Sequence, residues 1–259
     1  MITEDSFLHE RYLEPALNKT QSYRFTTKTT DFSNKNNAIE KDFVRNVEIT
    51  YLGKNKDLLI FDVFTSNIVF KHNQTIVKEK ILKEGALAFY DIELGVNDKG
   101  EIVKVFNRKE IENHWKQVKF EQKKINSGDE LDDFFAAISD LLNNEEQVIS
   151  FLNSRNMFGL FFHGLFAKPE SDKIPQKRTT AIIEFDNIIV NVEIWMSKDA
   201  PQFLITAQKS DDANYIPNDN EIKKYIGEWI YNKNSQLEEV FFEIENQNLN
   251  IKYNVLWVG

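Results

Sequence analysis

The sequence predicts an α+β fold, in which a mainly antiparallel sheet of about eleven strands carries a central block of three helices, residues 108–166, on one face. Two observations support this class. Apolar and polar residues alternate with a period of two from about residue 22 to residue 106 and again from residue 188, whereas the period is 3.6 in the segment between. Short turns join neighbouring strands, which is typical of antiparallel sheet with segregated helices.

The first half of the chain contains the clearest strand patterns. Residues 23–30 alternate regularly, and Val47, Ile49 and Tyr51 lie on one side of the next segment. Residues 58–70 are apolar on both sides, which is typical of a central strand. The clearest hairpin is the segment 88–106, where the turn Asn97-Asp98-Lys99-Gly100 separates two apolar runs.

Three helices follow, each predicted by a start signal and an apolar stripe. Asn107, Ser127 and Asn144 each precede such a stripe and have Glu or Gln three residues later, the spacing of an N-cap and its reciprocal partner. The first helix is predicted over residues 108–125. A short fourth helix is predicted near residues 219–226.

Strand patterns return in the last third of the chain and continue to Trp257. The chain is therefore predicted to have two regions. Residues 1–126 form an N-terminal antiparallel β region that ends in a helix, and residues 127–259 form a helical pair and a C-terminal antiparallel β region. No long flexible linker separates them, so one continuous domain stays an alternative.

Composition and motifs argue against most catalytic classes. Cysteine is absent, which excludes disulfides, zinc–thiolate sites and cysteine nucleophiles. The four histidines lack the spacing of a helical metal motif, and no glycine-rich phosphate loop, dinucleotide fingerprint or hydrolase elbow is present. We therefore expect no enzyme activity, no cofactor and no metal. An unrecognised hydrolase that uses scattered carboxylates stays open as an alternative.

Charge is distributed unevenly along the chain, whose net charge is −9. Residues 1–125 carry 21 Lys and Arg against 19 Asp and Glu, whereas residues 126–259 carry 11 against 22. The acidic half repels phosphate backbones and attracts basic surfaces, so we expect no nucleic-acid partner. The first residues have no secretory-signal pattern and no window is long enough for a membrane span, so we expect a cytoplasmic protein.

An aromatic cluster is the first candidate partner-binding site. The apolar residues of this segment surround a helix axis on every side: Met157, Phe158, Leu160, Phe161, Phe162, Leu165 and Phe166. The candidate binding residues among them are the phenylalanines Phe158, Phe161, Phe162 and Phe166. Such a segment is either buried between layers of the fold, or forms a patch that docks a partner or closes a pocket for an apolar ligand.

The outer face of the first helix is the second candidate site. Phe120 projects among lysines that include Lys116 and Lys123, opposite the apolar stripe of that helix. A solvated lysine face is usual, but a basic rim around an aromatic ring also suits an acidic partner surface.

These features predict a non-catalytic protein–protein interaction component of a bacterial cytoplasmic assembly, or an adaptor, with a toxin-immunity role as one variant. The expected partner is another protein, with a basic surface, or further copies of this chain. The alternative is a carrier that holds an apolar small molecule or lipid between a curved sheet and the helices. The number of strands and helices is similar to that of the open half-barrels of lipoprotein carriers, a likeness of architecture that assigns no residue.

Overall fold

The computed structural model describes residues 15–34, 37–73, 83, 86–162, 175–197, 203–210, 221–234 and 236–259. Its strands are β1 (Thr20–Asp31), β2 (Ile39–Asn55), β3 (Leu58–His72), β4 (Asp91–Val96), β5 (Ile102–Val105), β6 (Gln176–Ile182), β7 (Ile188–Ser197), β8 (Phe203–Lys209), β9 (Lys224–Tyr231), β10 (Leu237–Glu245) and β11 (Leu249–Trp257). Its helices are α2 (Arg108–Ile125), α3 (Asp129–Asn143), α4 (Glu145–Leu152) and α5 (Gly159–Phe162), with 3₁₀ turns η2 (Leu87–Phe89) and η3 (Ile183–Phe185).

All eleven strands belong to one antiparallel sheet, in the order β5-β4-β3-β2-β1-β11-β10-β9-β8-β7-β6. The predicted α+β class is thereby confirmed. The first strand lies in the middle of the sheet, where Thr27 faces Phe43 of β2 on one side and Tyr253 of β11 on the other. Residues 1–126 and 127–259 therefore contribute strands to the same sheet.

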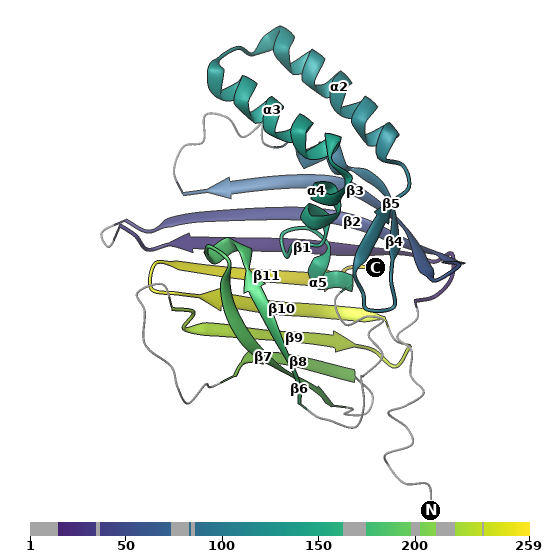
Figure 1. Cartoon of the computed structure of the whole chain (residues 1–259), viewed down its shortest axis with the longest axis vertical. Coiled ribbons are helices and arrows are strands. Elements are labelled where there is room, and N and C mark those ends of the chain that lie inside the picture. The colour runs from purple at the N-terminus through teal and green to yellow at the C-terminus, as the bar shows by residue number, and fades with distance from the viewer. Residues whose placement is uncertain are drawn as a thin grey trace, which may run out of the picture.

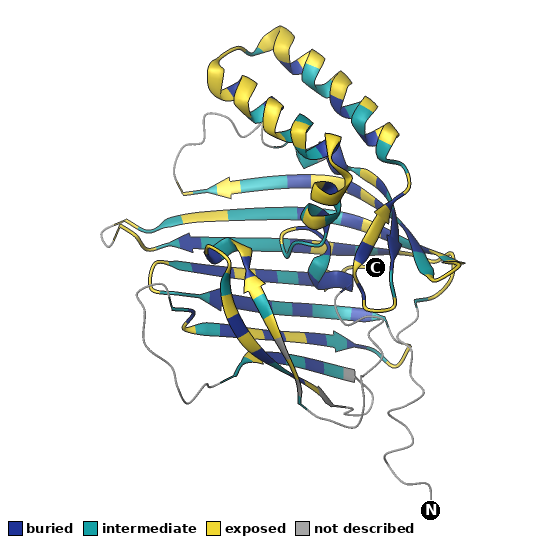
Figure 2. Cartoon of the chain, in the orientation of Figure 1, coloured by how far each residue is buried: buried dark blue, intermediate teal, exposed yellow. Residues whose placement is uncertain are grey.

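The sheet curls so that its two ends turn over one face (Figure 1). Right-handed twist accumulates over many strands and bends a wide sheet in this way. The edge strands β5 and β6 both contribute residues to one cavity, which places the two ends of the sheet near each other. Figure 2 shows buried residues recurring along the central strands, as the alternating pattern of one apolar face requires.

Helices α4 and α5 lie against the curled sheet, and α2 and α3 form an antiparallel pair beyond β3 (Figure 1). Three phenylalanines enter the core from this region. Phe158 comes from the turn between α4 and α5, and Phe161 and Phe162 come from α5. Phe161 meets the ring of Tyr23, with centroids 4.9 Å apart, and Phe162 meets Phe61 at the same distance. Phe158 meets Phe25 at 5.8 Å. These edge-to-face contacts join the helices to β1 and β3.

The helix limits predicted from the sequence agree with the structure better than the predicted N-cap hydrogen bonds do. Helix α2 spans the predicted residues 108–125, but the Asn107 side chain makes no cap bond. Its Oδ1 instead accepts from the Glu93 backbone N–H at 2.9 Å, and its Nδ2 donates to the carbonyl of Asp91 at 3.1 Å. Helix α3 likewise has no side-chain cap, and its N-cap is Gly128. Only Asn144 behaves as predicted, accepting from the Gln147 N–H at 3.2 Å.

The predicted helix near residues 219–226 is wrong where the chain is described. Residues 224–226 belong to β9, which pairs with β8 and β10. Tyr225, Gly227, Trp229 and Tyr231 are buried on alternate positions of this strand, so period-two burial overrides the short helical pattern.

Candidate functional site

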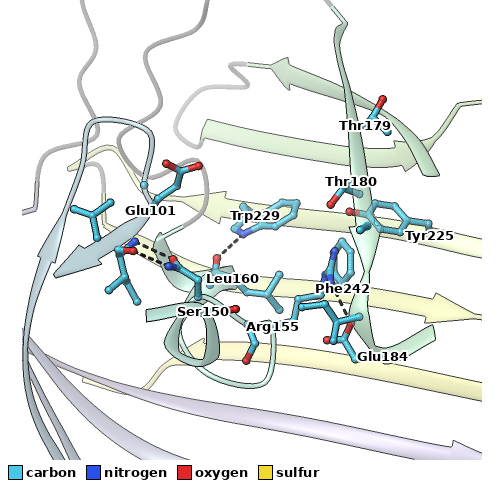
Figure 3. A pocket seen from close by; sticks show the side chains of 18 residues that line it. Glu101, Ser150, Arg155, Leu160, Thr179, Thr180, Glu184, Tyr225, Trp229 and Phe242 are labelled. Carbon is cyan, nitrogen blue, oxygen red and sulfur yellow. Dashed lines mark hydrogen bonds and ion pairs between the residues drawn. The ribbon is translucent and has the colours of Figure 1, made fainter. Parts of the chain in front are cut away.

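Two cavities lie beside helices α4 and α5. The first, the inter-edge pocket, has a volume of about 700 Å³ and lies between the two ends of the sheet. Figure 3 shows Glu101, before β5, on one side and Thr179 and Thr180 of β6 on the other. The rings of Trp229 and Phe242 lie between them, above the sheet (Figure 3).

Two charged side chains of the inter-edge pocket, Arg155 and Glu184, are paired with each other. Arg155 Nη1 pairs with Glu184 Oε2 at 3.2 Å, and the hydroxyl of Tyr253 donates to Glu184 Oε1 at 3.0 Å. Burial alone would lower the pKa of Arg155, but the neighbouring Tyr225 and Glu184 raise it overall. This ion pair connects the turn after α4 to η3 at the end of β6.

Two further contacts hold helices and sheet together at this pocket. Trp229 Nε1 donates to the carbonyl of Leu160 at 2.8 Å (Figure 3). Asn153 Oδ1 accepts from the Ile102 N–H at 2.9 Å, and its Nδ2 donates to the Ile102 carbonyl at 2.7 Å. The Asn153 side chain thus replaces a neighbouring strand at the edge of β5. In the inter-edge pocket, these hydrogen bonds therefore stabilise the packing of the helices against the sheet.

The second cavity, which we call the apolar pocket, lies between strands β1–β3 and helices α3 and α4. Its volume is about 660 Å³. Its main apolar walls are Phe43 and Phe70 on the sheet and Phe134, Ile138, Leu141 and Phe151 on the helices. These six side chains are each only half-buried, because one side of each faces the cavity. A mostly apolar cavity of this size is typical of a small-molecule site.

One wall of the apolar pocket contains a buried cation, Arg45 of β2, whose exposed fraction is 3%. Its Nη2 donates to the carbonyls of Asn156 at 2.7 Å and Met157 at 3.0 Å. The guanidinium carbon also lies 5.1 Å from the ring centroid of Phe158. These contacts fix the cation between the sheet and the turn after α4.

The charge of Arg45 has no counter-ion among the described residues, since no carboxylate there forms an ion pair with it. Its Nε is buried and has no hydrogen-bond partner within the described part of the chain. Burial lowers the pKa of Arg45 to about 10, so the side chain stays protonated at neutral pH. A buried, protonated group without a neutralising charge is costly for a folded chain.

Other charges of the apolar pocket lie where β2 and β3 reach the surface. Lys41 and Lys71 are exposed and line the cavity, as does Asp42. Together with Arg45, the described lining has three cationic side chains and one carboxylate. The pocket is thus net positive in a chain whose net charge is −9.

The aromatic cluster predicted from the sequence lies in the core. Phe158, Phe161 and Phe162 are buried, so a partner reaches them only if this part of the fold opens. Phe166 lies outside the described residues. Met157, which precedes the cluster, does line the apolar pocket.

The outer face of α2 is accessible. Phe120 is 63% exposed, and Lys124 Nζ lies 4.1 Å from its ring centroid. Lys116 is exposed too, and Lys123 pairs with Asp132 of α3 at 2.5 Å. Partner binding by these residues stays a prediction.

Sequence reasoning missed Arg45, although the strand pattern contained a signal. Arg45 follows the same period of two as Val47, Ile49 and Tyr51, which are buried. A charged residue at a core-facing position of a strand is unusual and points to a special environment. The apolar pocket itself had no such local signal, because its walls come from six separate elements: β1, β2, β3, η2, α3 and α4.

Within the described ranges, no group of three or more His, Asp or Glu side chains is arranged to hold a metal ion. None of the described helices is long and apolar enough to cross a membrane. Fold and pocket together define an α+β protein whose curled antiparallel sheet and covering helices enclose an apolar cavity.

No protein-family model matches the chain, and no curated protein sequence matches it. Among solved structures, the chain is similar to lipovitellin, in a structure described as "Lipid-protein interactions in lipovitellin". The alignment has a TM-score of 0.46 and 9% identity, and covers 95% of this chain. This chain spans 26% of the length of that lipovitellin chain.

Proposed function

We propose that the protein is a carrier that binds an apolar small molecule in the apolar pocket. The observation that carries the proposal is the cavity of about 660 Å³ whose walls are mainly phenylalanine and aliphatic side chains. Water gains few hydrogen bonds from such walls, so replacing it by an apolar ligand is favourable. The inter-edge pocket is a weaker candidate, because Arg155, Glu184 and Trp229 in its lining already have partners within the fold.

Filling the apolar pocket is expected to abolish binding. The change Ile138→Trp places a larger side chain into the cavity from α3, so a ligand no longer fits. We expect the affinity for the neutral fluorescent probe N-phenyl-naphthylamine to fall about tenfold or more. The measurement is a fluorescence titration, with dodecanol as the displacing ligand.

The matched control is Ile125→Trp, the same substitution at the end of α2, where the side chain is 65% exposed and does not line the pocket. This variant is expected to bind the probe like the unchanged protein. Native mass spectrometry of the unchanged protein should also reveal one bound ligand after incubation with dodecanol. Failure of every alkyl ligand to bind, neutral or charged, would contradict the carrier function.

The exposed aromatic of α2 supports a second candidate, a protein interaction. Phe120 and its lysines form a basic face, and residues 126–259 carry 22 Asp and Glu against 11 Lys and Arg. A second copy of this chain therefore offers a surface of complementary charge.

Replacing Phe120 by serine is expected to weaken self-association about tenfold, because an aromatic anchor is removed from the contact. Sedimentation velocity at low and high salt measures this association, which should decrease with salt. Phe32→Ser, at an exposed aromatic outside α2, is the control and should change nothing. A monomer at every protein concentration would exclude this second candidate.

A further inference from the structure

Arg45 places a fixed positive charge in a mainly apolar wall of the apolar pocket. The guanidinium is buried. Among the described residues, no carboxylate forms an ion pair with it, and no acceptor forms a hydrogen bond with its Nε. Backbone carbonyls and aromatic rings stabilise it only in part, because none of them has a full negative charge. An anion bound in the cavity would supply the missing charge.

We propose that the apolar pocket selects single-chain amphiphiles with an anionic head group, and that Arg45 determines this selectivity. The inference rests on the proposed carrier function and names the class of its ligand. The acyl chain lies against Phe134, Ile138 and Leu141 on the helices. The head group lies on the sheet side of the cavity, towards Arg45.

The burial of Arg45 distinguishes it from the lysines of the same pocket. Lys41 and Lys71 are exposed, so water and salt screen their charges. The Arg45 charge lies among the rings of Phe25, Phe43 and Phe158, at 5.1 to 5.4 Å from their centroids. Its field in the cavity is therefore stronger, and salt affects it less.

The single carboxylate of the described lining, Asp42, is the feature that would favour a cationic ligand instead. Its Oδ1 is buried, and none of the residues that the structure describes forms a hydrogen bond with it. Three cations oppose it in the same lining, and the most buried of the four side chains is Arg45. The balance of charge favours an anion, and the two cases give opposite results with matched amphiphiles.

The experiment compares four ligands with the same alkyl chain: dodecanoate, dodecyl phosphate, dodecanol and dodecylamine. Isothermal titration calorimetry of the full chain is expected to show the two anions binding about tenfold or more tightly than dodecanol. This preference should persist at about 1 M NaCl, where the Debye length is about 3 Å. Dodecanoate against dodecyl phosphate then distinguishes a fatty acid from a phosphorylated lipid as the source of the head group.

Variants assign the selectivity to a residue. Arg45→Met replaces the guanidinium by an apolar side chain of similar length, and this variant is expected to bind dodecanoate no better than dodecanol. Arg45→Lys keeps the charge and should retain the preference. Arg24→Met, the same substitution on the exposed side of β1, is the matched control and should behave like the unchanged protein. Circular dichroism checks that each variant folds, and the salt series on the unchanged protein tests the inference without any variant.

The possible failures are distinguishable. If no ligand binds, the carrier function itself is wrong. If dodecanol binds as tightly as dodecanoate, the carrier function stands and the selectivity is wrong. Tightest binding of dodecylamine would assign the site to Asp42, and loss of the anion preference at high salt would assign it to the exposed lysines.

Discussion

Raising the pH above about 10 is expected to unfold the protein in one cooperative transition, because buried tyrosines must then ionise. Tyr23, Tyr231 and Tyr253 are almost fully buried, and burial raises the pKa of each far above its ordinary value of 10. In the unfolded chain they lose their protons near pH 10. Above that pH the folded state retains three protons that the unfolded state releases, so stability falls as pH rises.

The size of this effect follows from the number of groups. Each tyrosine costs about 1.4 kcal/mol of stability per pH unit above pH 10, and the three together cost about 4 kcal/mol. Arg45 acts in the opposite direction between pH 10 and 12.5, because its folded pKa is lowered to about 10 and the unfolded chain then holds the extra proton. The net loss is about 3 kcal/mol per unit. Domains of ordinary stability do not withstand two or three units of such loss.

A pH titration followed by far-ultraviolet circular dichroism and by tyrosinate absorbance tests the prediction. The two signals should change together as the protein unfolds. Tyr253→Phe removes one of the three groups and, because Arg45 still acts in the opposite direction, should make the loss of stability with pH about half as steep. Full tyrosinate absorbance while the circular dichroism is unchanged would contradict the assigned burial.

Changing Gly159 to alanine is expected to destabilise the fold by about 3 kcal/mol or more. A Cβ at this position would meet the backbone carbonyl carbon of Asn153 at 2.7 Å and its oxygen still closer. The turn between them is closed by the Phe158 N–H to the Leu152 carbonyl at 3.0 Å and the Gly159 N–H to the Ser154 carbonyl at 3.1 Å. The clash cannot be relieved by rotating a side chain, so the turn after α4 must move.

Gly95→Ala is the matched control for this change. The nearest atoms to its Cβ, at 3.1 Å, are the outer side-chain atoms Leu58 Cδ1 and Phe106 Cε2. Small rotations relieve these two contacts, and the third neighbour, Lys104 Cβ at 3.2 Å, requires a shift of only a few tenths of an ångström, so we expect a loss of about 1 kcal/mol. Urea denaturation compares the two variants, and equal midpoints would exclude the tight turn as the reason.

Helix positions were predictable because their signal is local. The apolar stripe of residues 108–125 specifies a helix without reference to the rest of the chain, and the structure contains it at those limits. The predicted N-cap bond of Asn107 is not formed, because its side chain binds the backbone of Glu93 and Asp91 in β4 instead. Local residue spacing cannot reveal such a contact. A strand replaced the predicted helix near residue 224 for a similar reason, since β8 and β10 pair on both sides of it.

The candidate site was less predictable than the fold. The general idea of an apolar ligand between sheet and helices was available from the sequence, but its residues were not. Phe43, Phe70 and Phe134 lie far apart in the chain, and only the pairing of β2 with β3 and the packing of α3 bring them together. Arg45 was missed as well, although its place in an apolar alternation was a signal that could have revealed it.

The pairing of β1 with β11 has a consequence for synthesis in the cell. The second neighbour of this central strand is synthesised after the other ten described strands, so Tyr23 and Phe25 face an unfinished edge until residues 249–257 leave the ribosome. Contacts between such distant segments form slowly, and an unpaired apolar strand invites aggregation meanwhile. Nascent chains arrested before residue 249 should accordingly be captured by chaperones, whereas chains in which residues 249–257 have left the ribosome should lose that dependence.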